Sequence, residues 1–279
     1  MQVAFQGERG AYSEAAALEY FGDGMQPIPR PTFEEVFESV QAGQVDHGVV
    51  PIENSLGGSI HRNYDLLIRH QLHIVGEKIH RVRHCLIGQP GVTLSEITTI
   101  ISHPQALAQC EHTITRLGIA REPAYDTAGA VKMLKETGQR DRAAIASRRA
   151  AEVYAMQILD ENIEDDPANF TRFLVLAREP IQPDTPAKTS IVFTLRNVPG
   201  ALFKALSVFA LRDLDLTKIE SRPLAGSPWE YLFYLDFAGS TAGATSQRAL
   251  DHLSELATTL RVLGSYPRDS SYANESSQT

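Results

Sequence analysis

A hydroxyl and a guanidinium stand side by side between two aromatic rings in the stretch Asn169-Phe170-Thr171-Arg172-Phe173. Thr171 can donate a hydrogen bond without carrying charge, and Arg172 supplies a permanent cation whose planar fork fits a carboxylate. The pair would give a site one hydrogen-bond donor and one permanent cation. The two residues alone also allow a plainer interpretation, an ordinary threonine-arginine pair on the surface.

The apolar run at residues 173–177 is short, continuous and made mostly of large side chains, which is typical of a buried strand. Thr171 and Arg172 would then lie where this strand begins. A strand is a rigid support, so it can fix a hydrogen-bond donor and a cation in place.

Predicted strands alternate with predicted helices over residues 1–159, a pattern typical of a mainly parallel sheet. Hydroxyl residues recur where a strand passes into a helix, at Ser13, Ser55 or Ser59, Ser102, Thr127 and Ser147. Each one alone is explained as a helix cap. In an open parallel sheet, however, these junctions gather at the carboxyl edge, where helix amides attract anions. We therefore expect an anion-binding crevice at that edge.

The carboxyl-terminal third has a different order of elements. Three prolines between residues 180 and 186 predict a linker. Residues 188–267 follow the order βαββαβ, with a turn at residues 225–228, which is the ferredoxin-like arrangement. The polar stretch at residues 268–279 predicts a disordered tail.

Composition excludes several classes of protein. A net charge of −8 argues against a nucleic-acid partner, and the apolar runs are too short to span a membrane. Two cysteines, Cys85 and Cys110, cannot form a disulfide framework and lack the spacing of metal ligands. The chain enters a predicted strand directly, without a basic segment or a signal core, so we expect a cytoplasmic protein. No cofactor and no metal is expected.

Six ordered motifs resemble one known family. Four of them, at residues 51–55 (Pro-Ile-Glu-Asn-Ser), 102–105 (Ser-His-Pro-Gln), 126–128 (Asp-Thr-Ala) and 169–173, resemble the prephenate dehydratase family. Two more, at residues 200–203 (Gly-Ala-Leu-Phe) and 220–223 (Glu-Ser-Arg-Pro), resemble the phenylalanine-binding motifs of that family's regulatory ACT domain.

The resemblance implies an α/β fold in two domains. Residues 1–181 would form a two-lobed catalytic domain like a type 2 periplasmic binding protein. One lobe would hold about residues 1–77 with 160–181, and the other residues 78–159. Residues 188–267 would form a ferredoxin-like βαββαβ (ACT) domain.

The resemblance also implies the activity. Family members are lyases that convert prephenate to phenylpyruvate, with loss of carbon dioxide and water, in L-phenylalanine biosynthesis under feedback by L-phenylalanine. The expected small molecules are thus prephenate as substrate and L-phenylalanine as allosteric ligand. The expected assembly is a homodimer or homotetramer formed through ACT domains.

Site residues follow from the matched motifs. Thr171 would donate a hydrogen bond to the departing hydroxyl, and Glu53 would be a general acid or, alternatively, the ion-pair partner that positions Arg172. The expected substrate-binding residues are Asn54, Ser55, Ser102, Gln105, Thr127, Asn169, Arg172 and Phe173. The expected L-phenylalanine-binding residues are Asn197, Gly200, Ala201, Leu202, Glu220, Ser221 and Arg222. His103, ahead of a helix-start proline, is expected to be a cap.

Two alternatives remain open. The chain departs from the family pattern at Ala168 and at residues 129–131, both near the presumed cleft. The substrate could therefore be arogenate, which carries an amine where prephenate has a ketone. A different class of function is a non-catalytic, two-lobed amino-acid or solute sensor.

Overall fold

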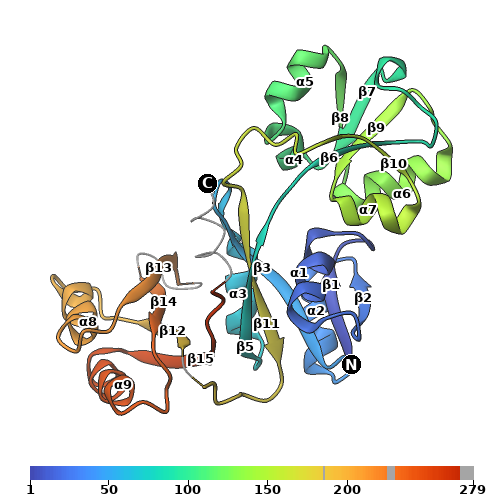
Figure 1. Ribbon diagram of the computed structural model, residues 1–279. Helices are drawn as coiled ribbons and strands as arrows, with labels where there is room; N and C mark the ends of the chain where they lie inside the picture. The colour runs from blue at the N-terminus through green and yellow to red at the C-terminus, as the bar shows by residue number, and fades with distance from the viewer. Residues whose placement is uncertain (185, 225–229, 271–279) are drawn as a thin grey trace. The chain divides into compact units, whose positions relative to one another are not determined.

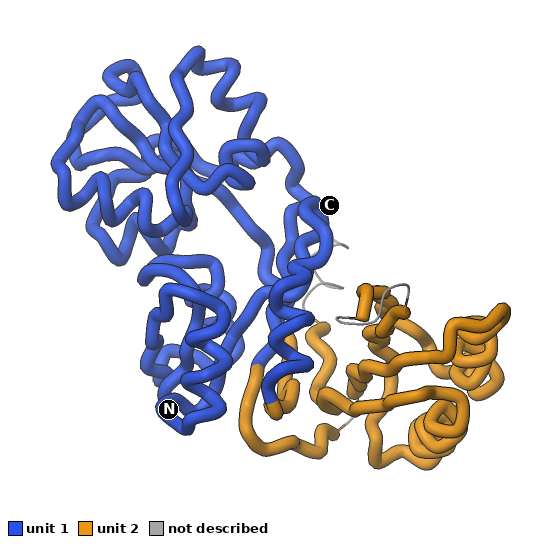
Figure 2. The backbone as a smooth tube through the Cα atoms, turned by 180° about the vertical axis from the view of Figure 1, so that it is seen from behind, with its two compact units in different colours: residues 1–70, 78–175 blue, residues 71–77, 176–279 orange. Residues whose placement is uncertain are grey.

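The computed structural model describes residues 1–184, 186–224 and 230–270. It divides into two compact units (Figures 1 and 2). The first comprises residues 1–70 and 78–175, and the second residues 71–77 and 176–279. Strands β5 (His73–Arg81) and β11 (Phe170–Ala177) have residues in both.

The first sheet has the strand order β2-β1-β3-β11-β5, with the short strand β4 paired to β3. Its other strands are β1 (Gln2–Gln6), β2 (Gln26–Arg30), β3 (His47–Asn54) and β4 (Gly58–Ser59). Its helices are α1 (Tyr12–Phe21), α2 (Phe33–Gln41) and α3 (His61–Arg69). Strand β1 is parallel to both of its neighbours, and Val3, Ala4 and Phe5 are fully buried, as expected of a central strand with both faces covered. As predicted, the late strand β11 returns to this sheet and lies between β3 and β5.

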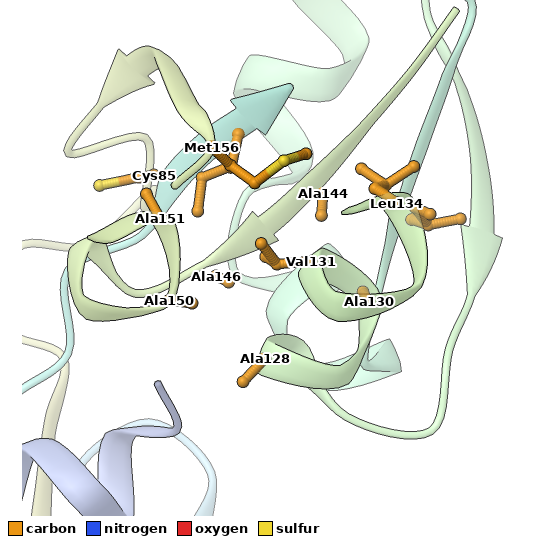
Figure 3. Packing of buried hydrophobic residues seen from close by; sticks show 12 residues of the cluster. Cys85, Ala128, Ala130, Val131, Leu134, Ala144, Ala146, Ala150, Ala151 and Met156 are labelled. Carbon is orange, nitrogen blue, oxygen red and sulfur yellow. The ribbon is translucent and has the colours of Figure 1, made fainter. Parts of the chain in front are cut away.

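The second sheet has the order β10-β6-β9-β7-β8. Its strands are β6 (Cys85–Gly88), β7 (Thr99–Ser102), β8 (Ala120–Pro123), β9 (Arg142–Ala146) and β10 (Gln157–Glu161). Its helices are η1 (Leu94–Glu96), α4 (Pro104–Ala108), α5 (Glu111–Leu117), α6 (Thr127–Thr137) and α7 (Arg148–Tyr154). Helices α6 and α7 pack on the sheet through small residues such as Ala128 and Ala150, together with Val131 and Leu134 (Figure 3). The two sheets form the predicted two-lobed α/β fold of the type 2 periplasmic-binding-protein kind.

The helix caps correct part of the sequence prediction. Ser147 caps α7, because its side chain accepts a hydrogen bond from the Ala150 amide at 3.0 Å. His103 caps α4 as expected, since its Nδ1 accepts from the Gln105 amide at 3.2 Å. Thr127 was a wrong choice of cap, because α6 begins at that residue and Asp126 supplies the capping oxygen.

Three other predicted caps are also wrong. Ser13 lies inside α1, Ser102 ends β7 one residue before the cap of α4, and α3 follows Ile60 without a side-chain cap, so that neither Ser55 nor Ser59 caps it. The first helical residue decides which side chain can cap, and sequence patterns locate it only to within a residue or two.

The second unit contains the predicted βαββαβ order. Its elements are β12 (Ala187–Thr194), α8 (Ala201–Ala210), β13 (Leu216–Pro223), β14 (Tyr231–Ala238), α9 (Ala244–Leu256) and β15 (Thr259–Pro267). The sheet is antiparallel, in the order β13-β14-β12-β15. The predicted turn at residues 225–228 lies outside the described residues, as does most of the predicted tail (271–279).

Cys85 and Cys110 are free and buried. None of the helices in the described ranges combines the length and the hydropathy needed to cross a bilayer.

Candidate active site

A cavity of about 550 Å³ lies within the first unit and is lined from both lobes. The first lobe contributes residues from the loop after β1, the start of α1, β3 and the start of α3. The second lobe contributes the starts of α4 and α6. Of the residues predicted to act on substrate, Asn54, Gln105, Thr127, Thr171 and Phe173 line this cavity.

Asn54 fixes the hydroxyl of Thr171. Its Nδ2 donates to Thr171 Oγ1 at 3.0 Å and to Asn169 Oδ1 at 2.8 Å, and both acceptors are buried. Its Oδ1 accepts from the backbone amides of Leu56 and Gly57 at 3.1 and 2.7 Å, which sets the orientation of the side-chain amide. Because Thr171 Oγ1 accepts from Asn54, its own hydrogen is available to donate elsewhere.

Strand geometry separates two residues that the sequence prediction had placed together. Adjacent residues on a strand face opposite sides, and Thr171 and Phe173 both line the cavity. Arg172 therefore faces the other side of β11 and is outside the cavity lining. The same alternation on β3 turns Glu53 away from the side on which Asn54 lies, and Glu53 is outside the lining as well.

Ser55 and Ser102 bond to the backbone rather than facing the cavity. Ser55 Oγ donates to the Ala168 carbonyl at 2.6 Å and accepts from the Phe170 amide at 2.9 Å. Ser102 Oγ is fully buried and donates to the Ile145 carbonyl at 2.6 Å. Asn169, also fully buried, acts through Asn54. The structure thus places these three residues as supports for the strands that carry the site.

Two charged residues of the cavity had no assigned role in the sequence prediction. Among the described residues that line it, Arg62 is the one guanidinium and Asp126 the one carboxylate. Arg62 lies at the start of α3 and pairs with both oxygens of Glu34, at 2.8 Å from Nε and 2.7 Å from an outer nitrogen. Arg62 was missed because its proximity to Thr171 arises from the tertiary fold. Asp126 lies within a matched motif and could have been singled out.

A partly buried chain of hydrogen bonds joins Tyr12, His84 and Gln109 along the cavity wall. Tyr12 Oη lies 2.7 Å from His84 Nδ1, and His84 Nε2 lies 2.9 Å from Gln109 Oε1. Burial lowers the pKa of His84 and raises the pKa of Tyr12 well above its usual value. Both groups are therefore neutral at pH 7. Tyr12 precedes one of the hydroxyl residues at the strand-to-helix junctions, which is the signal that could have identified it.

The two lobes touch beside the cavity. Ser147 Oγ donates to the Gly10 carbonyl at 2.6 Å, and Lys132 Nζ lies 3.1 Å from Glu8 Oε1. Gly10 has φ +88°, and a Cβ there would lie 2.5 Å from the Ala150 Cα, so this contact requires glycine.

A second cavity, of about 300 Å³, lies in the second unit near the start of α8. Of the residues predicted to bind L-phenylalanine, Asn197, Gly200, Ala201 and Leu202 line it. Glu220, Ser221 and Arg222 lie on β13 and are outside its lining. In the described ranges, no three His, Cys, Asp or Glu side chains are grouped to hold a metal ion.

Known proteins resemble this chain over nearly its whole length. The family model for prephenate dehydratase matches residues 3–181. An Arabidopsis thaliana relative, arogenate dehydratase/prephenate dehydratase 2, chloroplastic, is 55% identical over 96% of this chain and 73% of its own length.

Solved structures agree with that match. The prephenate dehydratase of Arthrobacter aurescens in complex with L-Phe has a TM-score of 0.87 at 31% identity, covering 96% of this chain and 90% of its own. GqqA, described as a novel type of quorum quenching acylase, has a TM-score of 0.91 at 38% identity, covering 98% of this chain and 100% of its own.

The comparisons correct one prediction and establish the family. The plant relative is chloroplastic, as are others from the same species, which contradicts the cytoplasmic location predicted from the sequence. That prediction rested on the first residues of the sequence, which do not determine the compartment. The extent of the family match, together with the two-lobed fold, identifies the class of chemistry. The chain belongs to the prephenate dehydratase family and is a dehydratase, an enzyme of the lyase class.

Proposed function

We propose that this dehydratase acts on prephenate and forms phenylpyruvate, carbon dioxide and water on the route to L-phenylalanine. The observation that carries this proposal is the Thr171 hydroxyl at the cavity wall, with Asn54 donating to its oxygen at 3.0 Å. The hydroxyl hydrogen is thereby left free to donate to a substrate oxygen.

The reaction needs few catalytic groups from the protein. The bond between the ring and its carboxylate breaks, and its electron pair enters the ring as the carbon-oxygen bond of the ring hydroxyl breaks. The hydroxide that leaves takes up a proton from solvent and becomes water, and the ring becomes aromatic. A threonine hydroxyl is too weak an acid to give up its proton, so Thr171 stabilises the departing oxygen by donating a hydrogen bond.

Prephenate carries two carboxylates, and the cavity offers cationic and partly positive groups for them. Arg62 is held by Glu34 through Nε and one outer nitrogen, which leaves the other outer nitrogen to donate to a substrate carboxylate. Thr127, at the start of the eleven-residue helix α6, adds a hydroxyl that can donate to the other carboxylate. We assign Gln105 to a neutral contact with substrate oxygens and Phe173 to the wall against the ring. Glu53 and Arg172 would then act through the strands that carry Asn54 and Thr171.

Arogenate is a second candidate substrate, because the 55% identical relative is named for both activities and because Asp126 brings a carboxylate to the cavity. An ammonium group on the substrate would be attracted by that charge.

Regulation by L-phenylalanine is proposed for residues 188–267, acting as an ACT domain. The supporting observation is the cavity beside Gly200, since the Arthrobacter relative has been solved as a complex with L-Phe. Assembly as a homodimer or homotetramer through these domains is part of the same proposal.

The test is turnover of each substrate by the full chain. We expect prephenate to yield phenylpyruvate, which is measured by its absorbance in alkali. Arogenate is assayed in parallel by the release of phenylalanine. Binding of prephenate without any product would contradict the proposal and favour the solute-sensor alternative.

A further inference from the structure

The Asp126 carboxylate has one oxygen engaged in helix capping and one oxygen left over. Oδ1 accepts the backbone amide of Gly129 and so caps α6. Oδ2 makes no hydrogen bond with any described residue, although Asp126 is only partly exposed and lines the cavity. Capping needs a single oxygen, and serine or asparagine would serve as well. The helix dipole favours the negative charge at this end of α6, and Oδ2 remains open to a further partner.

Gly129 leaves room for this carboxylate. A Cβ at Gly129 would lie 2.8 Å from Asp126 Oδ1 and 3.3 Å from Oδ2, so any other residue would push the carboxylate aside. Glycine is less favourable than alanine inside a helix, so α6 gives up stability at this position. Gly7, which also lines the cavity, has φ +106°, and a Cβ built there would lie 4.0 Å from Oδ2.

The charges nearby do not neutralise Asp126. Lys132, on the same helix, pairs with Glu8 at 3.1 Å. Burial raises the pKa of Asp126, and the negative charge of Glu8 raises it further. The Gly129 amide, His103 and Lys132 act in the opposite direction and lower this pKa. A cation placed beside Oδ2 would replace the solvation that burial has removed.

Prephenate and arogenate differ at one group of the side chain, a ketone in the first and an ammonium in the second. A ketone oxygen only accepts hydrogen bonds, so it gains nothing beside a carboxylate. An ammonium donates to a carboxylate and carries the opposite charge. We propose that Asp126 recognises the ammonium group of arogenate and sets how the enzyme divides its activity between the two substrates. This inference rests on the proposed function.

The test removes the charge and keeps the cap. Asp126→Asn preserves the shape of the side chain, and Asp126→Ser is a second capping residue without charge. Wild type and both variants are assayed for kcat/KM on each substrate, with unfolding temperatures recorded. We expect the ratio of kcat/KM for arogenate to that for prephenate to fall by at least about tenfold in both variants, as for loss of a charge-assisted hydrogen bond. A purely structural role would lower both activities together and leave the ratio unchanged.

The matched control is Glu8→Gln. It removes one unit of negative charge close to the same cavity, but from a side chain outside the lining. We expect the substrate ratio to change by less than about threefold, since a charge that does not touch the substrate is partly screened.

A second measurement separates this inference from the proposed function. In a Thr171→Ala background, the Kd of each substrate is measured by calorimetry with and without Asp126→Asn. Weaker binding of arogenate, with prephenate affected less, would support the role of Asp126 even if turnover were lost. An unchanged ratio of Kd values, or of kcat/KM values, would overturn that role. Wild-type turnover of prephenate alone, with no binding of arogenate, would overturn it and leave the proposed function standing.

Discussion

At the scale of single residues, the site depends on the direction of one hydrogen bond. Asn54 can only donate through Nδ2, and its orientation is fixed by the two backbone amides that its Oδ1 accepts. Thr171 must then accept, which leaves its hydrogen for the substrate. Both residues are buried, so water does not compete for these contacts.

Reversing the hydrogen bond between Asn54 and Thr171 tests whether its direction matters for catalysis. In Asn54→Asp the donor becomes an acceptor, so the Thr171 hydroxyl would turn its hydrogen toward the new carboxylate. We expect kcat on prephenate to fall by about 10²-fold, the size found for removal of one transition-state donor, with a smaller change in KM. Steady-state kinetics measure both constants, and circular dichroism checks the fold. A variant with the wild-type kcat would show that the direction of this bond is immaterial.

His84 makes stability depend on pH. Burial lowers the pKa of His84 below its usual 6.5, so below about pH 6.5 the unfolded chain binds a proton that the folded chain does not. The contribution of His84 to stability is therefore present above pH 6.5 and is lost as the pH falls through the folded pKa. We expect His84→Gln to reduce the loss of unfolding free energy between pH 7 and 5, measured by denaturant titration. Parallel pH profiles for the two proteins would contradict this role.

At the scale of elements, regular patterns could be predicted and exact positions could not. The βαββαβ order follows from periodicity, whereas the return of β11 to the first sheet was implied only by the family resemblance. The faces of Thr171 and Arg172 could also have been separated in advance, because neighbours on a strand point in opposite directions. The caps and the contribution of Arg62 could not, since they depend on where each helix begins and on how the strands pack.

Helix α6 carries Asp126 at its cap and is held by the core of the second lobe. Leu134 is fully buried in that core, while its neighbour Met133 is 37% exposed. We expect Leu134→Ala to lower the free energy of unfolding by about 2–5 kcal/mol, through lost burial and a residual cavity. The control Met133→Ala should change it by no more than about 0.5 kcal/mol, as is usual for surface substitutions. Chemical denaturation of both variants decides the point, and equal effects would contradict the assigned packing.

At the scale of the whole molecule, each compact unit has a cavity of its own, of about 550 and about 300 Å³. Strand β11 begins at Phe170 in the first unit and ends at Ala177 in the second, so the strand that carries Thr171 continues into the unit proposed to bind L-phenylalanine. The compartment of the protein belongs to this scale too, and no pattern within the folded units could predict it.

Gly200 allows a test of the second cavity. It has φ +79°, precedes α8 and lines the cavity, so a side chain there would be strained and would take up open space beside the start of the helix. We expect Gly200→Ala to weaken binding of L-phenylalanine by at least about fivefold, measured by calorimetry, because the amides at the start of the helix would hold its carboxylate. Gly118→Ala is the matched control, with φ +64° at the end of α5 and no atom within 4 Å of its Cβ position. Equal affinities for Gly200→Ala and the control would contradict the proposed site.

The central claim is that the Thr171 hydroxyl assists the departure of the ring hydroxyl in this cavity. Its most direct test is kcat on prephenate for wild type, Thr171→Ser and Thr171→Ala. We predict that Thr171→Ala loses about 10²- to 10³-fold, while Thr171→Ser, which keeps a hydroxyl within reach of Asn54, loses less than about tenfold. A folded Thr171→Ala protein that kept more than about half of the wild-type kcat would have its activation barrier raised by less than about 1 kcal/mol. That result would contradict the claim.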